Sequence, residues 1–352
     1  MANEIRGNKI KDMIIYLTSN CNLKCTHCYV PKEKTLKELS IDDLNWIRNT
    51  FDIKNVNLMG GEPFLYPHLE DAIDIFKNVT ITTNGLFLAS DNPNVDRWIK
   101  FFKKKKEIGN DGKEVKTLSI QLSIEGNQIE TDAVRGPGVW DKVLDTARLL
   151  KKNDISCYFR CSYHEGNLQS IPWLIDNLAH PLDIPLILFP QIGMSPLTPD
   201  QQIWLFNLLL EKNTKYKSHN LIAQPHFMQW LGEKGRCEAG SERLCITYSK
   251  DIIPCHFDFD YVLGSIGNSL DVINKNREMY LNAAKRIQPS CEFCNHADIC
   301  RSGCYMSDSH AGCPLKNRFT KEVYMNMHNT NTESMSIQVK EMKGLIKGSL
   351  IC

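Results

Sequence analysis

Short runs of apolar and β-branched residues alternate with longer amphipathic segments between residue 13 and about residue 215. The short runs predict six strands, at residues 13–17, 56–58, 79–82, 118–124, 156–162 and 184–189. One helix is predicted to begin after Ser40 as its N-cap, and others to cover residues 68–77, 94–104, 139–153, 168–178 and 199–211. Strict alternation of strand and helix predicts an α/β fold with a parallel sheet, either open or curled into a partial barrel.

The candidate catalytic and ligand-binding residues directly follow the predicted strands. Cysteines at 21, 25 and 28 follow the first strand, Gly-Gly-Glu-Pro at 60–63 follows the second, and Thr-Thr-Asn-Gly at 82–85 follows the third. Active sites gather at the carboxyl ends of parallel strands. The three segments are therefore predicted to meet at one edge of the sheet.

Composition narrows the class of protein. The chain has 352 residues, a formal net charge of +1 and no apolar stretch near the ~18 residues of a membrane helix, so neither nucleic acid nor a membrane is predicted as a partner. Residues 1–7 lack a secretory apolar core, which favours the cytoplasm. Fourteen cysteines in such a compartment indicate metal ligation rather than disulfides.

Cys21, Cys25 and Cys28 form a C-x3-C-x2-C loop. Three thiolates on so short a loop can hold three irons of a [4Fe–4S] cube and leave the fourth iron open to a non-protein ligand. A structural zinc site is the alternative, but it needs a fourth ligand, and His27 is too constrained between Cys25 and Cys28 to supply it easily. A disulfide joins two cysteines, and the odd count of three in this stretch argues against disulfides here.

This loop, with Gly60-Gly61-Glu62 one strand later, resembles the radical S-adenosylmethionine superfamily. The resemblance implies that Cys21, Cys25 and Cys28 hold a [4Fe–4S] cluster whose open iron binds S-adenosylmethionine. It further implies reductive cleavage of that cofactor to a 5′-deoxyadenosyl radical, which abstracts a hydrogen atom from a substrate. The cofactor would do the difficult chemistry, while the protein binds and orients it.

Other cofactor contacts follow from the same resemblance. Gly60, Gly61 and Glu62 match the motif that binds the methionine amino group, where glycines permit close backbone approach. The family places ribose and carboxylate contacts at five further positions: Thr83, Asn84, Ser123, Glu125 and Arg160. Tyr29 stands where an aromatic side chain commonly stacks near adenine. Surface, capping or packing roles are the alternatives for these six residues.

A second group of cysteines begins near residue 237 and resembles the SPASM extension of radical S-adenosylmethionine enzymes. The resemblance implies two auxiliary [4Fe–4S] clusters, one held by Cys237, Cys245, Cys255 and Cys304, the other by Cys291, Cys294, Cys300 and Cys313. Lys250 departs from the family, which usually has glycine at that position, so the turn there could be built differently. Two four-cysteine zinc sites are the alternative.

These observations predict three parts: a partial (β/α)6 barrel at 1–225, a small cysteine-rich SPASM domain at 226–320 and a helical tail at 321–352. The middle part has little periodic apolar sequence, so bound metal is expected to supply much of its stability. Cys157 and Cys161 lie four apart on a predicted strand and share a face. They are either small apolar packing residues or, at Cys161, a hydrogen-atom donor.

The SPASM branch is associated chiefly with the modification of peptides and proteins. The leading hypothesis is an oxidoreductase that crosslinks, oxidises or epimerises a ribosomal peptide or protein. Asp132-Ala-Val-Arg-Gly136 resembles a segment of such enzymes. A separate leader-binding protein and an electron donor such as flavodoxin or ferredoxin are the expected partners. A small-molecule dehydrogenase or epimerase acting on a sugar or aminocyclitol, and an iron–sulfur electron carrier or sensor, are the rival hypotheses.

Overall fold

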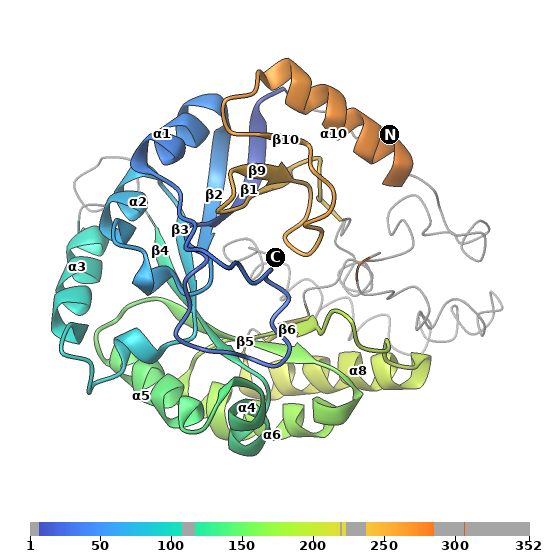
Figure 1. The fold of residues 1–352 in the computed structure, drawn as a ribbon. Helices are drawn as coiled ribbons and strands as arrows, with labels where there is room; N and C mark the ends of the chain where they lie inside the picture. The colour runs from blue at the N-terminus through green and yellow to red at the C-terminus, as the bar shows by residue number, and fades with distance from the viewer. Residues whose placement is uncertain (1–6, 108–116, 219, 223–236, 285–305, 307–352) are drawn as a thin grey trace. The chain divides into compact units, whose positions relative to one another are not determined.

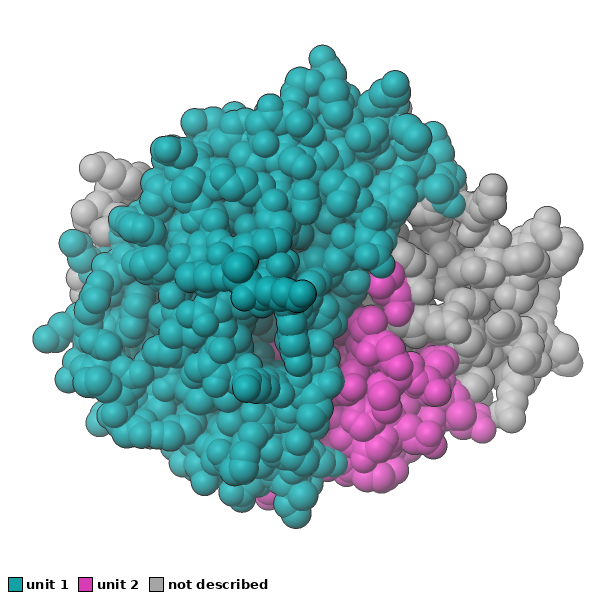
Figure 2. Space-filling view, in the orientation of Figure 1, with its two compact units in different colours: residues 1–159, 238–284 teal, residues 160–237, 285–352 magenta. Residues whose placement is uncertain are grey.

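A computed structural model describes residues 7–107, 117–218, 220–222, 237–284 and 306. The chain divides into two compact units, one of residues 1–159 and 238–284 and the other of residues 160–237 and 285–352 (Figure 2). The predicted domain boundary near residue 225 and the predicted tail at 321–352 lie outside the described residues, so the three-part division stays a prediction. No helix within the described ranges is long and apolar enough to span a membrane.

The first unit contains a mostly parallel sheet with helices along it (Figure 1). Its parallel strands are β8 (Arg243–Ile246), β1 (Lys9–Tyr16), β2 (Asp52–Met59), β3 (Val79–Thr83) and β4 (Leu118–Ile124), in that spatial order. The antiparallel strands β9 (Asp251–Ile253) and β10 (Gly264–Ser265) extend the β8 edge. The parallel sheet predicted from the alternation is confirmed.

Helices connect the parallel strands as the amphipathic segments predict. They are α1 (Ile41–Thr50), α2 (Leu69–Ile75), α3 (Val95–Glu107), α4 (Gln128–Arg135) and α5 (Val139–Lys152), with short 3₁₀ turns at Pro63–Leu65 and Leu86–Leu88. A further helix, α10 (Leu270–Ala284), follows β10. Ser40 caps α1 as predicted: its hydroxyl accepts from the Asp43 N–H, and Asp43 accepts from the Ser40 N–H in return. The helices α4, which is only eight residues long, and α10 were not predicted from the sequence.

The second unit continues the alternation. Strand β5 (Cys157–Tyr163) enters it from the first unit, and β6 (Leu186–Pro190) pairs in parallel with β7 (Leu221–Ile222). The predicted helix at 168–178 is irregular: 3₁₀ at Glu165–Ser170, α6 at Ile171–Leu174, a π turn at Ile175–Ala179 and α7 at His180–Leu182. The helix predicted at 199–211 is α8 (Pro199–Tyr216).

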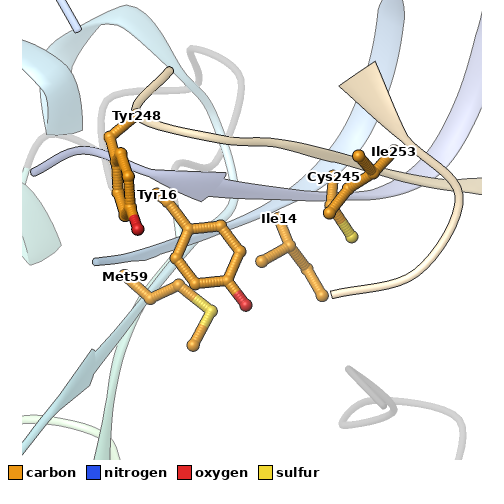
Figure 3. Packing of buried hydrophobic residues seen from close by; sticks show 6 residues of the cluster. All are labelled: Ile14, Tyr16, Met59, Cys245, Tyr248 and Ile253. Atoms are coloured by element: carbon orange, nitrogen blue, oxygen red, sulfur yellow. The ribbon is translucent and has the colours of Figure 1, made fainter. Parts of the chain in front are cut away.

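Residues 238–284 have more regular structure than their sequence pattern predicts. Strand β8 pairs with β1 in the register Ile14↔Cys245, so this late segment shares the core of the first strands. Ile14, Tyr16, Met59, Cys245, Tyr248 and Ile253 pack together as one buried cluster (Figure 3). The sequence pattern did not predict this packing, because the apolar runs at 244–246 and 252–253 are too short to show periodicity. The expectation that bound metal supplies much of the stability stays a prediction.

Arg277 of α10 is the largest fully buried side chain of the described residues. Its guanidinium donates to the carbonyls of Gly240 (3.0 Å), Gly7 (3.0 Å) and Ser241, and burial lowers the pKa of this group to about 10. These bonds attach α10 to the turn that precedes β8 and to Gly7, which precedes β1.

Replacing Arg277 with methionine is expected to lower the free energy of unfolding by about 3 kcal/mol or more. The substitution keeps a long side chain but leaves several buried carbonyls without a donor. Denaturant unfolding measures the effect, with Arg97→Met as the control, because Arg97 forms an exposed pair with Glu70. Equal losses in the free energy of unfolding for the two variants would contradict a stabilising role for the Arg277 hydrogen bonds.

Candidate functional site

The three early cysteines lie on one closed loop between β1 and α1. The two arms of the loop pair at its base, where the Leu39 N–H donates to Leu17 (3.0 Å) and the Ser19 N–H donates to Lys37 (2.9 Å). The loop tip is attached to the end of α4, since the Thr26 N–H donates to the Val134 carbonyl at 3.0 Å. The backbone thus holds the cysteines beside the carboxyl end of β1, as the sequence predicts.

The thiols of the loop lie near one another. Burial, together with the charges of Glu62, Cys25 and Cys28, raises the pKa of Cys21 to about 11, although a backbone N–H from Leu23 opposes the shift. Burial also raises the pKa of Cys25. Thiols held protonated in this way need a cation to become thiolate ligands, and bound iron supplies one.

The described residues contain no group of three His, Cys, Asp or Glu side chains that converges on a single metal ion. In a [4Fe–4S] cube each thiolate binds a different iron. The thiols of Cys21, Cys25 and Cys28 supply one ligand for each of three irons, so they fit this cluster.

Gly60 and Gly61 pack directly against the cysteine loop. The Gly61 N–H donates to the Thr18 carbonyl and the Glu62 N–H to the Asn20 carbonyl, both at 2.7 Å. A Cβ atom on Gly60 would lie 2.6 Å from the Thr18 oxygen, and one on Gly61 would collide with the Asn20 carbonyl and approach Cys21 Cβ at 2.9 Å. The two glycines, which were predicted to let a cofactor approach the backbone, are thus already needed for the turn to pack against the cysteine loop.

Glu62 fixes this glycine turn to the end of β3. Its buried carboxylate accepts from the Phe64 N–H (3.2 Å), the Thr83 hydroxyl (2.7 Å) and the Asn84 N–H (2.9 Å). Burial nevertheless raises the pKa of Glu62 to about 7, against the effect of these bonds. The side chain of Asn84 also donates to Asn22 of the cysteine loop at 2.8 Å. The three segments predicted to share one edge of the sheet do meet there.

The raised pKa of Glu62 predicts that the free energy of unfolding decreases as the pH rises. Below pH 4.5 the carboxyl is protonated in both folded and unfolded chains; between pH 4.5 and about 7 only the folded chain keeps the proton. The free energy of unfolding should therefore decrease by about 3 kcal/mol across this interval. Glu62→Gln should remove the decrease and exposed Glu165→Gln should not, as measured by denaturant unfolding from pH 4 to 8. Parallel profiles for wild type and Glu62→Gln would refute this assignment.

A second attachment of the loop involves Glu125, which follows β4. Its carboxylate accepts from Arg135 Nε (3.0 Å) and pairs with His27 Nε2 (3.0 Å), which lies between Cys25 and Cys28. Burial opposes ionisation, but the charge of Arg135 and the contact with His27 leave the pKa of Glu125 below its ordinary value. Arg135 and His27 are therefore site residues that the sequence analysis missed. The Asp-Ala-Val-Arg-Gly segment in the sequence pointed to Arg135, but its contact with Glu125 could not be inferred without knowing that Arg135 lies on α4.

Arg160 and Cys161 are neighbours on β5, so their side chains point to opposite faces. Arg160 lies over the Phe189 ring at 4.6 Å, whereas Cys161 is fully buried with Tyr163. One face of β5 cannot supply both the predicted cofactor contact and the predicted hydrogen-atom donor. The burial of Cys161 agrees with the packing alternative. Its donor role, like the cofactor role of Arg160 and of half-buried Ser123, stays a prediction.

Tyr29 lies against the turn that follows Cys255. Its ring contacts Phe257 edge to face, with 4.5 Å between centroids, and keeps more than a third of its surface exposed. This contact agrees with the packing alternative for Tyr29, and its role near adenine stays a prediction.

Two of the predicted auxiliary ligands are close together. Cys245 on β8 and Cys255 after β9 are both buried, and burial, followed by the charge of Cys255, raises the pKa of Cys245 well above its ordinary value. Cys237 is half-buried. The remaining predicted ligands lie outside the described residues: Cys291, Cys294, Cys300, Cys304 and Cys313.

Comparison with known proteins gives this site a context. Residues 15–171 match the model of the Radical SAM superfamily. The protein named antilisterial bacteriocin subtilosin biosynthesis protein AlbA, from Bacillus subtilis (strain 168), is 23% identical over 316 residues, 82% of this chain and 66% of that protein. A GTP 3′,8-cyclase of Limosilactobacillus fermentum is 29% identical over 198 residues, 51% of this chain and 54% of the cyclase. The chain thus spans less than two thirds of the length of these curated relatives.

Solved structures share the fold, among them the following two. Streptococcus suis SuiB bound to precursor peptide SuiA aligns with a TM-score of 0.68 and 15% identity, over 88% of this chain and 76% of that one. Native anSMEcpe with bound AdoMet and Cp18Cys peptide aligns with a TM-score of 0.70 and 16% identity, over 94% of this chain and 99% of that one.

Proposed function

The chain carries a radical S-adenosylmethionine domain, and we propose that it cleaves S-adenosylmethionine reductively and directs the resulting radical at a peptide or protein. Proteins of this superfamily use a [4Fe–4S] cluster together with S-adenosylmethionine. When bound, the cluster would supply the electron for cleavage at its open iron. The observation that carries the proposal is the attachment of the cysteine loop to the Gly60–Glu62 turn, which brings thiols and cofactor motif together.

The residues of the chain have defined tasks in this proposal. Cys21, Cys25 and Cys28 hold the cluster, and the backbone at Gly60 and Gly61 receives the methionine amino group of the cofactor. Glu62 keeps that backbone in place through the bonds to Phe64, Thr83 and Asn84 described above. Glu125, which also pairs with Arg135, holds the other side of the loop through its buried contact with His27. A loop fixed on two sides is suited to keeping a reactive centre in one position.

The names of the related proteins favour a peptide as the substrate. AlbA is named for subtilosin biosynthesis, SuiB is bound to a precursor peptide, and anSMEcpe is bound to a peptide designated Cp18Cys. The two auxiliary clusters, with Cys237, Cys245, Cys255 and Cys304 on one and Cys291, Cys294, Cys300 and Cys313 on the other, belong to the same proposal. They would carry electrons to or from the first cluster, and a flavodoxin or ferredoxin would supply the reducing electron.

The test is co-expression of the chain with a candidate precursor peptide, followed by mass spectrometry of the peptide. Loss of two mass units would indicate crosslinking or oxidation, and unchanged mass with deuterium uptake from solvent would indicate epimerisation. Cys25→Ala is the matched inactive control. Cofactor cleavage without any peptide change, across a panel of precursors, would contradict the peptide assignment and favour the small-molecule alternative.

A further inference from the structure

The turn between β8 and β9 contacts the cysteine loop and the first turn of α1 with three consecutive residues. The Tyr248 hydroxyl donates to the Pro31 carbonyl at 2.7 Å. The Lys37 ammonium donates to the Ser249 hydroxyl at 3.1 Å, and the Lys250 ammonium pairs with Asp43 at 2.9 Å. Each residue of the turn therefore bonds a different point of the chain that leads from Cys28 to α1.

These points lie where they can hold the loop closed. Residues 37–39 pair with residues 17–19 at the base of the cysteine loop, and Pro31 lies three residues after Cys28. Asp43 belongs to the capping box of α1, the helix in which the loop ends. The contacts from the turn thus fix the returning arm of the loop along its length.

Lys250 makes its contact from an unfavourable backbone conformation. Its φ is +72°, in the left-handed region that a side chain with a Cβ atom rarely adopts. The turn itself is regular, since the Lys250 N–H donates to the Thr247 carbonyl and the Thr247 N–H donates to the Asp251 carbonyl, both at 2.9 Å. The backbone here is the one that glycine would adopt without strain, so the departure from the family's glycine leaves the turn intact and adds a cation.

The ammonium of Lys250 meets a carboxylate that is almost fully covered. The Asp43 side chain is 9% exposed and also accepts from the Ser40 N–H and hydroxyl, each at 2.8 Å. Strained non-glycine residues persist where the surrounding structure uses them. The ion pair gives this residue a use that glycine could not supply.

We propose that residues 248–250 form a clasp that positions the first-cluster loop, with Lys250 as its chain-specific positioning residue. The inference rests on the proposed function for the identity of what the loop holds. The same hairpin carries Cys245 on β8 and leads to Cys255 after β9, so the clasp connects the first-cluster loop to two predicted ligands of an auxiliary cluster.

Hydrogen exchange of the full, iron-loaded chain tests the clasp. Lys250→Met keeps the backbone strain and side-chain length but removes the cation. Amides of residues 31–43 should exchange about threefold faster in this variant, with other segments unchanged. Lys250→Arg should restore wild-type exchange. Lys212→Met, which removes a comparable Lys–Asp pair with Asp176, should leave residues 31–43 unchanged.

Lys250→Gly separates positioning from general stability. Glycine relieves the strain and loses the ion pair, so the unfolding midpoint should stay or rise while residues 31–43 exchange faster. Wild-type exchange at residues 31–43 in Lys250→Met, or faster exchange spread evenly over the unit, would overturn the clasp. If the chain never forms a cluster but Lys250→Met shows the expected exchange pattern, the clasp is supported and the proposed function is refuted. The two failures are therefore distinguishable.

Discussion

Alanine at Cys25 is expected to remove the first cluster and to leave the rest of the chain folded. Each thiolate holds one iron of the cube, and a loop with two thiolates cannot hold the three irons that need protein ligands. Iron content should fall by about four atoms per chain, and the electron paramagnetic resonance signal that shifts on addition of S-adenosylmethionine should disappear.

The matched control is Cys157→Ala, which removes a half-buried thiol outside the loop. That variant should keep the wild-type iron content and the wild-type signal. Equal iron in wild type and Cys25→Ala would show that the loop holds no cluster, and the assignment of all three early cysteines would then be wrong.

Alanine at Gly61 is expected to have the second largest effect, although it adds one methyl group. That methyl would collide with the Asn20 carbonyl and crowd Cys21, and both are parts of the cysteine loop. Backbone atoms cannot move aside as a flexible side chain can, so the loop must shift. We expect a loss of about 2–3 kcal/mol in the free energy of unfolding and loss of most iron from the first cluster.

Gly193→Ala provides the comparison, since its Cβ would meet no atom within 4 Å while its φ of +83° carries the usual strain of a left-handed residue. It should cost about 1 kcal/mol and leave the iron content unchanged. If Gly61→Ala binds iron as wild type does, the close packing of the glycine turn on the loop has no role in holding the cluster.

The strands of the parallel sheet could be predicted because each contains a local signal. Residues 56–58, 79–82 and 118–124 are apolar runs that lie inside β2, β3 and β4. The meeting of the cysteine loop with Glu62 could also be predicted, since carboxyl ends of parallel strands share one edge. These inferences need only local sequence and the rules of strand connection.

The contacts that could not be predicted join distant parts of the chain. Tyr248 bonds Pro31 across 217 residues, and β8 pairs with β1 although its apolar run, residues 244–246, is very short. Glu125 was predicted as a cofactor contact, whereas its observed partners are Arg135 of the unpredicted α4 and His27. Lys250 looked like a sign of a different turn, and only its backbone angle shows that the turn is kept.

The most direct test of the central proposal is to incubate the anaerobically reconstituted and reduced chain with S-adenosylmethionine and to measure 5′-deoxyadenosine. The loop geometry and the radical S-adenosylmethionine domain predict that 5′-deoxyadenosine and methionine form in equal amounts with wild type and not with Cys25→Ala. A chain that contains its full iron but forms no 5′-deoxyadenosine would contradict the proposal.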